Sequence, residues 1–150
     1  MTQVLPRLAG LLAAVAIALP LSTQAAERVS VARDKVNLRT GPGTHHAADW
    51  MLSRGYPLQV VRRQGAWLKV RDFEGDQGWI YRAMTHRVPH HVVKAERANL
   101  REGPGTRHSL VTTLSQGEVL KTRRKTDRWV KVETDEGLTG WVARSLVWGW

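Results

Sequence analysis

The 150-residue chain contains no cysteine, and this absence excludes disulfides, thiolate nucleophiles and thiolate metal ligands together. After residue 26 no apolar run is long enough to span a bilayer, which takes roughly 20 residues. The same part of the chain holds no apolar stripe at helical spacing over three turns. These absences leave a β-rich protein that is held together by its hydrophobic cores alone.

Residues 1–26 have the pattern of a secretory signal. Arg7 is their one charge, an apolar run of 14 residues follows at 8–21, and small residues dominate 22–26. Because this run is shorter than a membrane span, we expect a cleaved signal rather than an anchor, with the cut after Ala25 or Ala26. The mature protein is then expected to be periplasmic or secreted, with no transmembrane segment.

The mature chain is an internal duplication. Residues 34–85 align with residues 96–147 at a constant offset of 62 without a gap, and 21 of the 52 positions are identical. The identities include glycine, proline and tryptophan, which rarely coincide by chance: Gly41, Pro42, Gly43, Trp67, Gly78 and Trp79 recur as Gly103, Pro104, Gly105, Trp129, Gly140 and Trp141. A repeat at this spacing predicts two copies of one small domain.

Each copy has the pattern of β structure. Polarity alternates along 67–71 and 129–133, and glycine-bearing turns at 72–77 and 134–139 lead to second strands at 78–81 and 140–143. Short strands at close spacing favour small barrels, whose closure hides strand edges. The predicted organisation is a signal peptide at 1–26, a first barrel at 27–85, a linker at 86–92 and a second barrel at 93–150. The linker lacks Gly and Ser, so we expect one cooperative unit.

Three motifs, each present in both copies, resemble the bacterial SH3-like (SH3b) domain family. They are Asn-Leu-Arg-x-Gly-Pro-Gly-Thr at 37–44 and 99–106, Trp-x-Lys-Val at 67–70 and 129–132, and Gly-Trp-Ile/Val at 78–80 and 140–142. The resemblance implies an all-β fold of two tandem small SH3-like β-barrels, each of five strands. It also implies an extracytoplasmic setting and recognition of cell-wall or protein ligands, without catalysis.

The repeated Gly-Pro-Gly segment has two interpretations. A phosphate-cradling loop needs a helix after it, and no helical pattern follows either copy. A tight structural turn fits better, because glycine adopts backbone angles that other residues resist and proline fixes one bend. Asn37 and Asn99 can bond the backbone of their own loops.

The candidate ligand site is built around Trp67 and Trp129. Period-two alternation directs Leu68 and Val70 to the core and leaves each tryptophan beside Lys69 or Lys131 on the outer face. Tyr81 is an aromatic neighbour in the first copy, whereas Ala143 stands there in the second. A groove for proline-rich peptides needs more aromatic side chains than this, so that ligand preference is poorly supported. Alternatively, each tryptophan only covers one end of its barrel and binds no ligand.

Basic residues accompany this site. The mature chain has 22 basic and 13 acidic residues, because Arg7 is the only one of the 23 basic residues that lies in the signal. Such a balance steers encounters with anionic envelope surfaces. Export makes nucleic acid an unsuitable native partner. The predicted ligand-binding set is Trp67, Lys69, Tyr81, Arg62 and Arg63 in the first copy, and Trp129, Lys131, Arg123 and Arg124 in the second.

The histidines and the remaining tryptophans receive structural roles. His45-His46 and His90-His91 are adjacent pairs whose side chains point apart, with no carboxylate at ligand spacing, so no metal site and no cofactor are predicted. His46 and His108 share a repeat position, which indicates a role in the loop. We expect Trp79 and Trp141 to serve packing, and Trp148 and Trp150 to pack between the barrels.

Two functions follow from these residues. The first is an exported binding module for peptidoglycan or its stem peptides, and the second is a protein-interaction or assembly factor of the cell envelope. The chain lacks cysteine and any serine in a Gly-x-Ser-x-Gly setting. It is therefore predicted not to be an enzyme.

Overall fold

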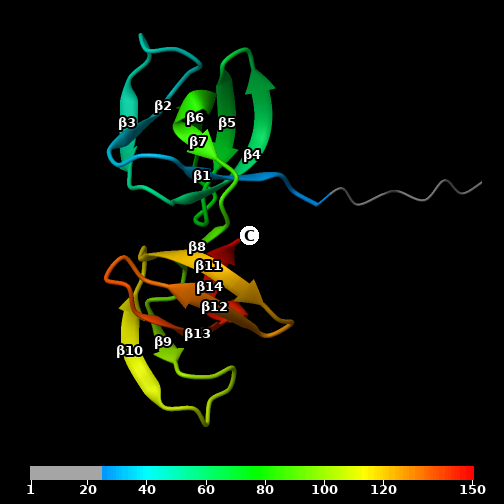
Figure 1. The fold of residues 1–150 in the computed structure, drawn as a ribbon. Coiled ribbons are helices and arrows are strands. Elements are labelled where there is room, and N and C mark those ends of the chain that lie inside the picture. The colour runs from blue at the N-terminus through cyan, green and yellow to red at the C-terminus, as the bar shows by residue number, and fades with distance from the viewer. Residues whose placement is uncertain (1–24) are drawn as a thin grey trace, which may run out of the picture.

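A computed structural model describes residues 25–150, so the predicted signal peptide lies, apart from Ala25 and Ala26, outside the described residues. The described chain forms two antiparallel sheets of seven strands each (Figure 1). Its only helical segments are two single 3₁₀ turns, η1 (Arg82–Met84) and η2 (Arg144–Leu146). The predicted all-β fold of two tandem SH3-like barrels is confirmed.

The first sheet curls around its own core, with strand order β3-β2-β6-β5-β4-β1-β7. Its strands are β1 (Arg28–Val31), β2 (Val36–Arg39), β3 (Ala48–Leu52), β4 (Pro57–Gln64), β5 (Trp67–Arg71), β6 (Gln77–Tyr81) and β7 (Thr85–His86).

The second sheet repeats this topology, with strand order β10-β9-β13-β12-β11-β8-β14. Its strands are β8 (His90–Val93), β9 (Arg97–Arg101), β10 (Leu110–Ser115), β11 (Val119–Lys125), β12 (Trp129–Glu133), β13 (Thr139–Ala143) and β14 (Val147–Gly149).

The strand count exceeds the five per barrel that the family resemblance implies. Strands such as β2 and β7 contain only four and two residues and carry too little alternation to be recognised in the sequence. The β5–β6 and β12–β13 hairpins lie where the glycine-bearing turns predicted them. Gly75 and Gly137 occupy those turns with positive φ angles of 96° and 83°, a region that favours glycine.

Each barrel has a separate hydrophobic core. Leu68 and Val70 of β5 point into the first, and Val130 and Val132 of β12 point into the second, all at most 1% exposed. Burying such side chains contributes about 1.5–3 kcal/mol each. The inward alternation predicted for these strands is confirmed, so the residues between them face outward.

The two barrels contact each other mainly through β1 of the first barrel and the C-terminal tryptophans. The Ser30 hydroxyl donates to the Val88 carbonyl (2.9 Å), and the Trp150 indole Nε1 donates to Ser30 Oγ (3.2 Å). The Arg28 guanidinium lies 5.5 Å from the centre of the Trp148 ring. Trp148 and Trp150 therefore pack against the first barrel as expected, although both are half-buried rather than enclosed. Only residues 87–89 separate β7 from β8.

Candidate functional site

An outward-facing aromatic pair marks one end of the β5–β6 hairpin. Trp67, the first residue of β5, lies directly opposite Tyr81, the last residue of β6. Their ring centres are 5.5 Å apart and the ring planes are tilted by 53°, the geometry that aromatic pairs prefer. Trp67 is half-buried and Tyr81 is 41% exposed, so both rings present surface to solvent.

These two rings line a groove of about 660 Å³ in the first barrel. The other lining residues come from the segment before β2, from β2 itself, from the Gly-Pro-Gly loop and from η1: Arg33, Asp34, Lys35, Val36, Asn37, Arg39, Gly43, Thr44, His45 and Met84. Three of these residues are basic and one is acidic, so the groove favours anionic groups. Sequence reasoning missed Arg33 and Lys35, because they lie in an irregular segment without a strand pattern.

The Gly-Pro-Gly loop is held by the arginine of its own motif. The Arg39 guanidinium donates to the carbonyls of Thr44 (3.2 Å) and His46 (2.8 Å), and Arg101 donates likewise to His108 (3.0 Å). A Cβ on Gly41 would lie 2.5 Å from the His46 ring. The first glycine is therefore needed for close packing and not, as the sequence suggested, for a positive φ, which it does not have. The loop role predicted for His46 is confirmed.

The second barrel has a matching groove that is divided into two hollows. Trp129 lines two adjoining hollows of about 280 and 530 Å³. Asn99, Arg101 and Thr106 line the smaller hollow, and they are the repeat equivalents of three residues in the first groove. Ala143 replaces Tyr81, so Trp129 has no aromatic partner opposite it. The second groove therefore lacks the ring pair of the first.

Arg62 and Lys69 form a basic pair next to the first groove. They lie directly opposite each other on β4 and β5, and Lys69 is also opposite Trp79 of β6. Lys69 follows Trp67 by two residues, so the basic pair and the aromatic pair share the outer face of the sheet. Like charges in such positions repel each other, and no ion pair to either residue occurs within residues 25–150.

The second barrel repeats this arrangement. Arg124 lies opposite Lys131, and Lys131 lies opposite Trp141. Trp79 is 8% exposed and Trp141 is half-buried on this outer face. The long stems of neighbouring basic side chains can cover such rings while their charges stay in water. Both tryptophans thus pack outside the hydrophobic cores.

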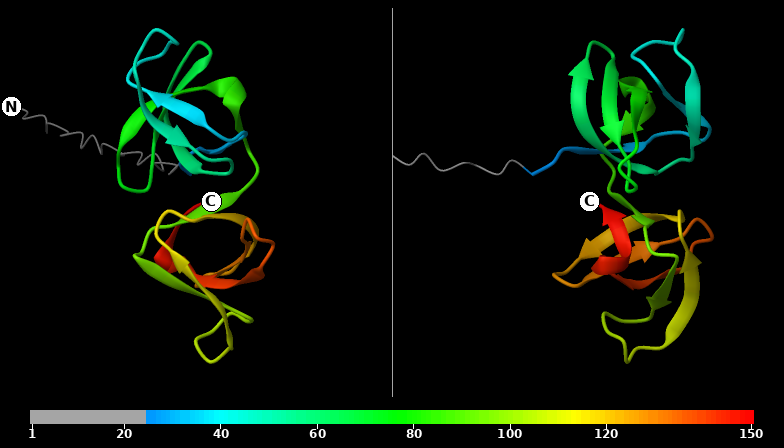
Figure 2. Two further views of the ribbon diagram at one scale, coloured as in Figure 1. Left: turned by 90° about the vertical axis from the view of Figure 1, so that its left-hand side faces the viewer. Right: turned by 180° about the vertical axis from the view of Figure 1, so that it is seen from behind.

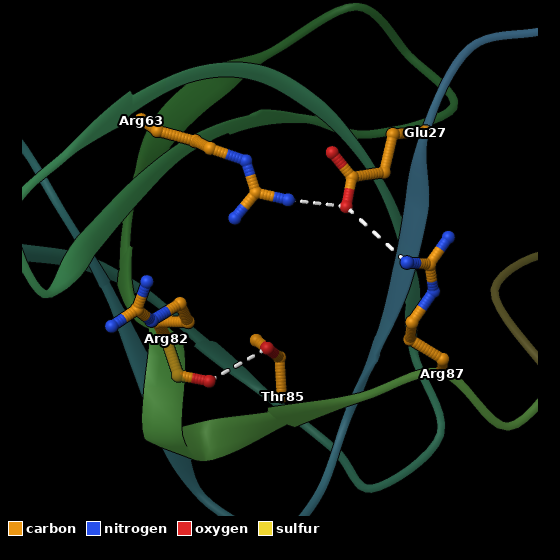
Figure 3. A network of polar contacts seen from close by, with 5 residues as sticks. All are labelled: Glu27, Arg63, Arg82, Thr85 and Arg87. Atoms are coloured by element: carbon orange, nitrogen blue, oxygen red, sulfur yellow. Dashed lines mark hydrogen bonds and ion pairs between the residues drawn. The ribbon is translucent and has the colours of Figure 1, made fainter.

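The two other predicted arginines are already paired with carboxylates. Figure 3 shows Arg63 reaching across the end of the first barrel to Glu27, with Arg87 3.9 Å from the same carboxylate on its other side. In the second barrel Arg123 binds Glu133. The structure therefore brings Trp67 and Tyr81 together, places Lys69 and Arg62 beside them, and turns Arg63 and Arg123 toward other partners.

The histidines lie apart from the grooves, except His45. His91 is 3% exposed, and its Nδ1 is 2.6 Å from Thr122 Oγ1. Burial lowers the pKa of His91 to about 4, and nearby Lys125 adds to the effect. Burial also lowers the pKa of His90, against the opposing influence of its bond to the Val88 carbonyl. Both imidazoles are thereby kept neutral at pH 7.

Within the described part of the chain, carboxylates rather than histidines form the group with metal-ligand spacing. Asp72, Glu74 and Asp76 hold oxygens within 4.8 Å of one another in the β5–β6 turn. Asp72 Oδ1 already accepts hydrogen bonds from the backbone N–H groups of Glu74 and Asp76, so the formation of the turn explains why these carboxylates lie close together.

Residues 25–150 contain no helix with the length and apolarity to cross a bilayer.

Comparisons with known families agree with this architecture. Two family models, each described as "Bacterial SH3 domain", match residues 32–86 and residues 96–147. A curated relative, the "Putative N-acetylmuramoyl-L-alanine amidase YrvJ" of Bacillus subtilis (strain 168), is 22% identical over 136 residues, which cover 83% of this chain. The matched part spans 26% of that relative's own length.

Solved structures were also matched. The NlpC/P60 family protein from Bacillus cereus ATCC 10987 is 14% identical with a TM-score of 0.39, and the match covers 81% of this chain and 56% of that one. NlpC2 from Trichomonas vaginalis is 11% identical with a TM-score of 0.37, and the match covers 85% and 49%.

The prediction that the chain is not an enzyme is contradicted by the Bacillus subtilis relative, which is named as an amidase. That prediction rested on the lack of a cysteine nucleophile and of a Gly-x-Ser-x-Gly serine. Those absences exclude two kinds of catalytic nucleophile and no other kind. They are therefore not sufficient to conclude that a chain similar to a named amidase has no catalytic activity.

Proposed function

Because the chain belongs to the bacterial SH3 domain family and carries two copies of its domain in tandem, we propose that it is a cell-wall-binding module of the bacterial envelope. Its ligand is the peptide part of peptidoglycan, held in the Trp67–Tyr81 groove. The observation that carries this proposal is the outward aromatic pair on a groove of about 660 Å³. The relative named for N-acetylmuramoyl-L-alanine, the unit that joins glycan to peptide in the wall, supports the ligand class.

The groove has two preorganised sides. One wall is the pair of rings, and the other is the loop that Arg39 fixes, so both walls are preorganised before a ligand arrives. Stem peptides carry free carboxylates, and Arg33 and Lys35 supply exposed cations on the loop side. The rings provide short-range contact area, while the cations orient the ligand.

The basic pair extends the attraction beyond the groove. Arg62 and Lys69 hold two like charges opposite each other, an arrangement that destabilises the free protein slightly and is relieved by an anionic partner. The same pair recurs as Arg124 and Lys131. We assign these pairs to long-range attraction of the anionic wall, with a contribution that salt screens.

The test is binding to purified sacculi. Replacing Trp67 or Tyr81 by Ala is expected to weaken binding at least about tenfold, since central aromatic contacts are each worth about 2 kcal/mol or more. Trp50→Ala is the matched control, because Trp50 is 61% exposed on the same barrel and does not line the groove. Equal binding by folded Trp67→Ala, Tyr81→Ala and the control would refute the assignment.

The basic pair has its own test. A double Arg62→Ala, Lys69→Ala variant is expected to lose affinity mainly at low ionic strength and to match the parent at high salt. Lys94→Ala, Lys125→Ala removes the same charge at exposed positions outside both grooves. If the two double variants respond to salt identically, net charge rather than this pair drives the attraction.

A further inference from the structure

The two grooves lie in different parts of the molecule and share no lining residue. Both the loop at 41–44 and the loop at 103–106 line a groove, and Figures 1 and 2 show these loops at opposite ends of the two-barrel molecule. The residues that join the barrels, among them Arg28, Ser30, Val88, Trp148 and Trp150, line neither groove. Both grooves are therefore accessible at the same time.

The barrels are also coupled rather than loosely tethered. Three residues separate β7 from β8, and the last strand, β14, pairs with β8 and contacts β4 of the first barrel. The bond from the Trp150 indole to Ser30 ties the C-terminal residue to the first barrel. The first barrel also packs closely against the second at Gly55, because a Cβ on this residue would lie 2.7 Å from the His90 ring. The placement of the two groove loops at opposite ends of the molecule is thus built into the fold.

From this arrangement we infer that the protein bridges two separate segments of the wall polymer, one in each groove. The inference rests on the proposed function, since it requires that each groove accept such a segment. Two sites on one face would raise the affinity for a single strand through a high effective concentration. Sites at opposite ends of a short, coupled body instead hold two strands together, so the product of binding is a cross-link.

The two grooves contribute unequally to the bridge. The first presents the paired rings of Trp67 and Tyr81 to its ligand, whereas the second offers Trp129 opposite Ala143. The first groove therefore anchors the protein, and the second captures a further segment with lower affinity. Loss of Trp67 should impair both capture and bridging, while loss of Trp129 should impair bridging alone.

A two-label assay measures the bridge. The full protein is loaded onto biotin-labelled sacculi, the excess is washed away, fluorescent sacculi are added, and fluorescence recovered on streptavidin is recorded. We expect fluorescence to be recovered with the parent protein, in an amount that rises with the protein loaded on the biotin-labelled sacculi. Trp129→Ala should keep most of its loading on the first sacculi and lose at least about tenfold in fluorescence recovered.

Charge-matched variants separate the outcomes. Tryptophan-to-alanine replacement leaves the net charge unchanged, so aggregation of sacculi by a basic protein would persist in Trp129→Ala. Trp50→Ala should bridge like the parent. If Trp129→Ala bridges as well as the parent, or if the parent loads without recovering fluorescence, the bridging inference is wrong while the wall-binding proposal stands. If the parent does not load onto sacculi at all, the proposed function is wrong and the bridge with it.

Discussion

His91 makes the stability of the second barrel depend on pH. Its imidazole is buried beside Thr122, and burial lowers its pKa to about 4 in the folded protein. In the unfolded chain the pKa returns to its usual value near 6.5. Between these two values the unfolded state binds more protons than the folded state. Stability is therefore complete above about pH 6.5 and is lost as the pH falls toward 4.

The size of this effect follows from the two pKa values. Proton linkage between a pKa of about 4 and one of about 6.5 gives a loss of about 2 kcal/mol between pH 7 and pH 5. A domain pair of this size should then melt several degrees lower at pH 5. His90, whose pKa is also lowered by burial, contributes in the same direction. The experiment therefore has to distinguish the contribution of His91 from that of His90.

The assay is urea denaturation of the parent and of His91→Asn at pH 7 and pH 5. The Asn amide occupies the place of Nδ1 and can still bond Thr122, but it does not titrate. We expect the parent to lose about 2 kcal/mol more than the variant between the two pH values. His90→Asn, with His91 intact, should retain most of the loss. Equal losses in the parent and His91→Asn would refute the reasoning.

Three further perturbations test the packing. Trp150→Phe removes the indole bond to Ser30 and should cost about 1 kcal/mol in a denaturant titration; an unchanged midpoint would show that the bond does not stabilise the pair of barrels. Gly78→Ala places a Cβ 2.5 Å from Leu38 and should cost about 1–3 kcal/mol, and an unaltered melting curve would contradict that clash. Arg39→Met should speed amide hydrogen exchange in the loop at 41–46, and unaltered exchange would show that the guanidinium does not hold it.

Much of the architecture was predictable because the duplication repeats its signals. The offset of 62 aligned the two copies, and period-two alternation correctly sent Leu68 inward and Trp67 outward. Those inferences depend only on local geometry. They hold because a strand with one buried face leaves its side chains no other orientation.

The distribution of the arginines was not predictable. A register shift between Val60 and Arg62 decides that Arg62 lies opposite Lys69 on the outer face, while Arg63 lies opposite the core residue Leu68 and reaches across the barrel end. The sequence analysis predicted that Arg62 and Arg63 act together as one basic pair, because their residue types give no sign of a β-bulge between the strands. Arg33 and Lys35 were missed for a related reason, since they reach the groove from an irregular segment in which Lys35 has a φ of 57°.

The central claim, that the grooves of both barrels hold the ligand, is tested most directly by nuclear magnetic resonance of the seven tryptophan indoles during titration with a soluble muropeptide. The account predicts that the indole signals of Trp67 and Trp129 move, with Trp67 saturating first, while those of Trp79 and Trp148 stay in place. Shifts confined to Trp50, or no shift of Trp67 at a concentration that saturates binding, would contradict it.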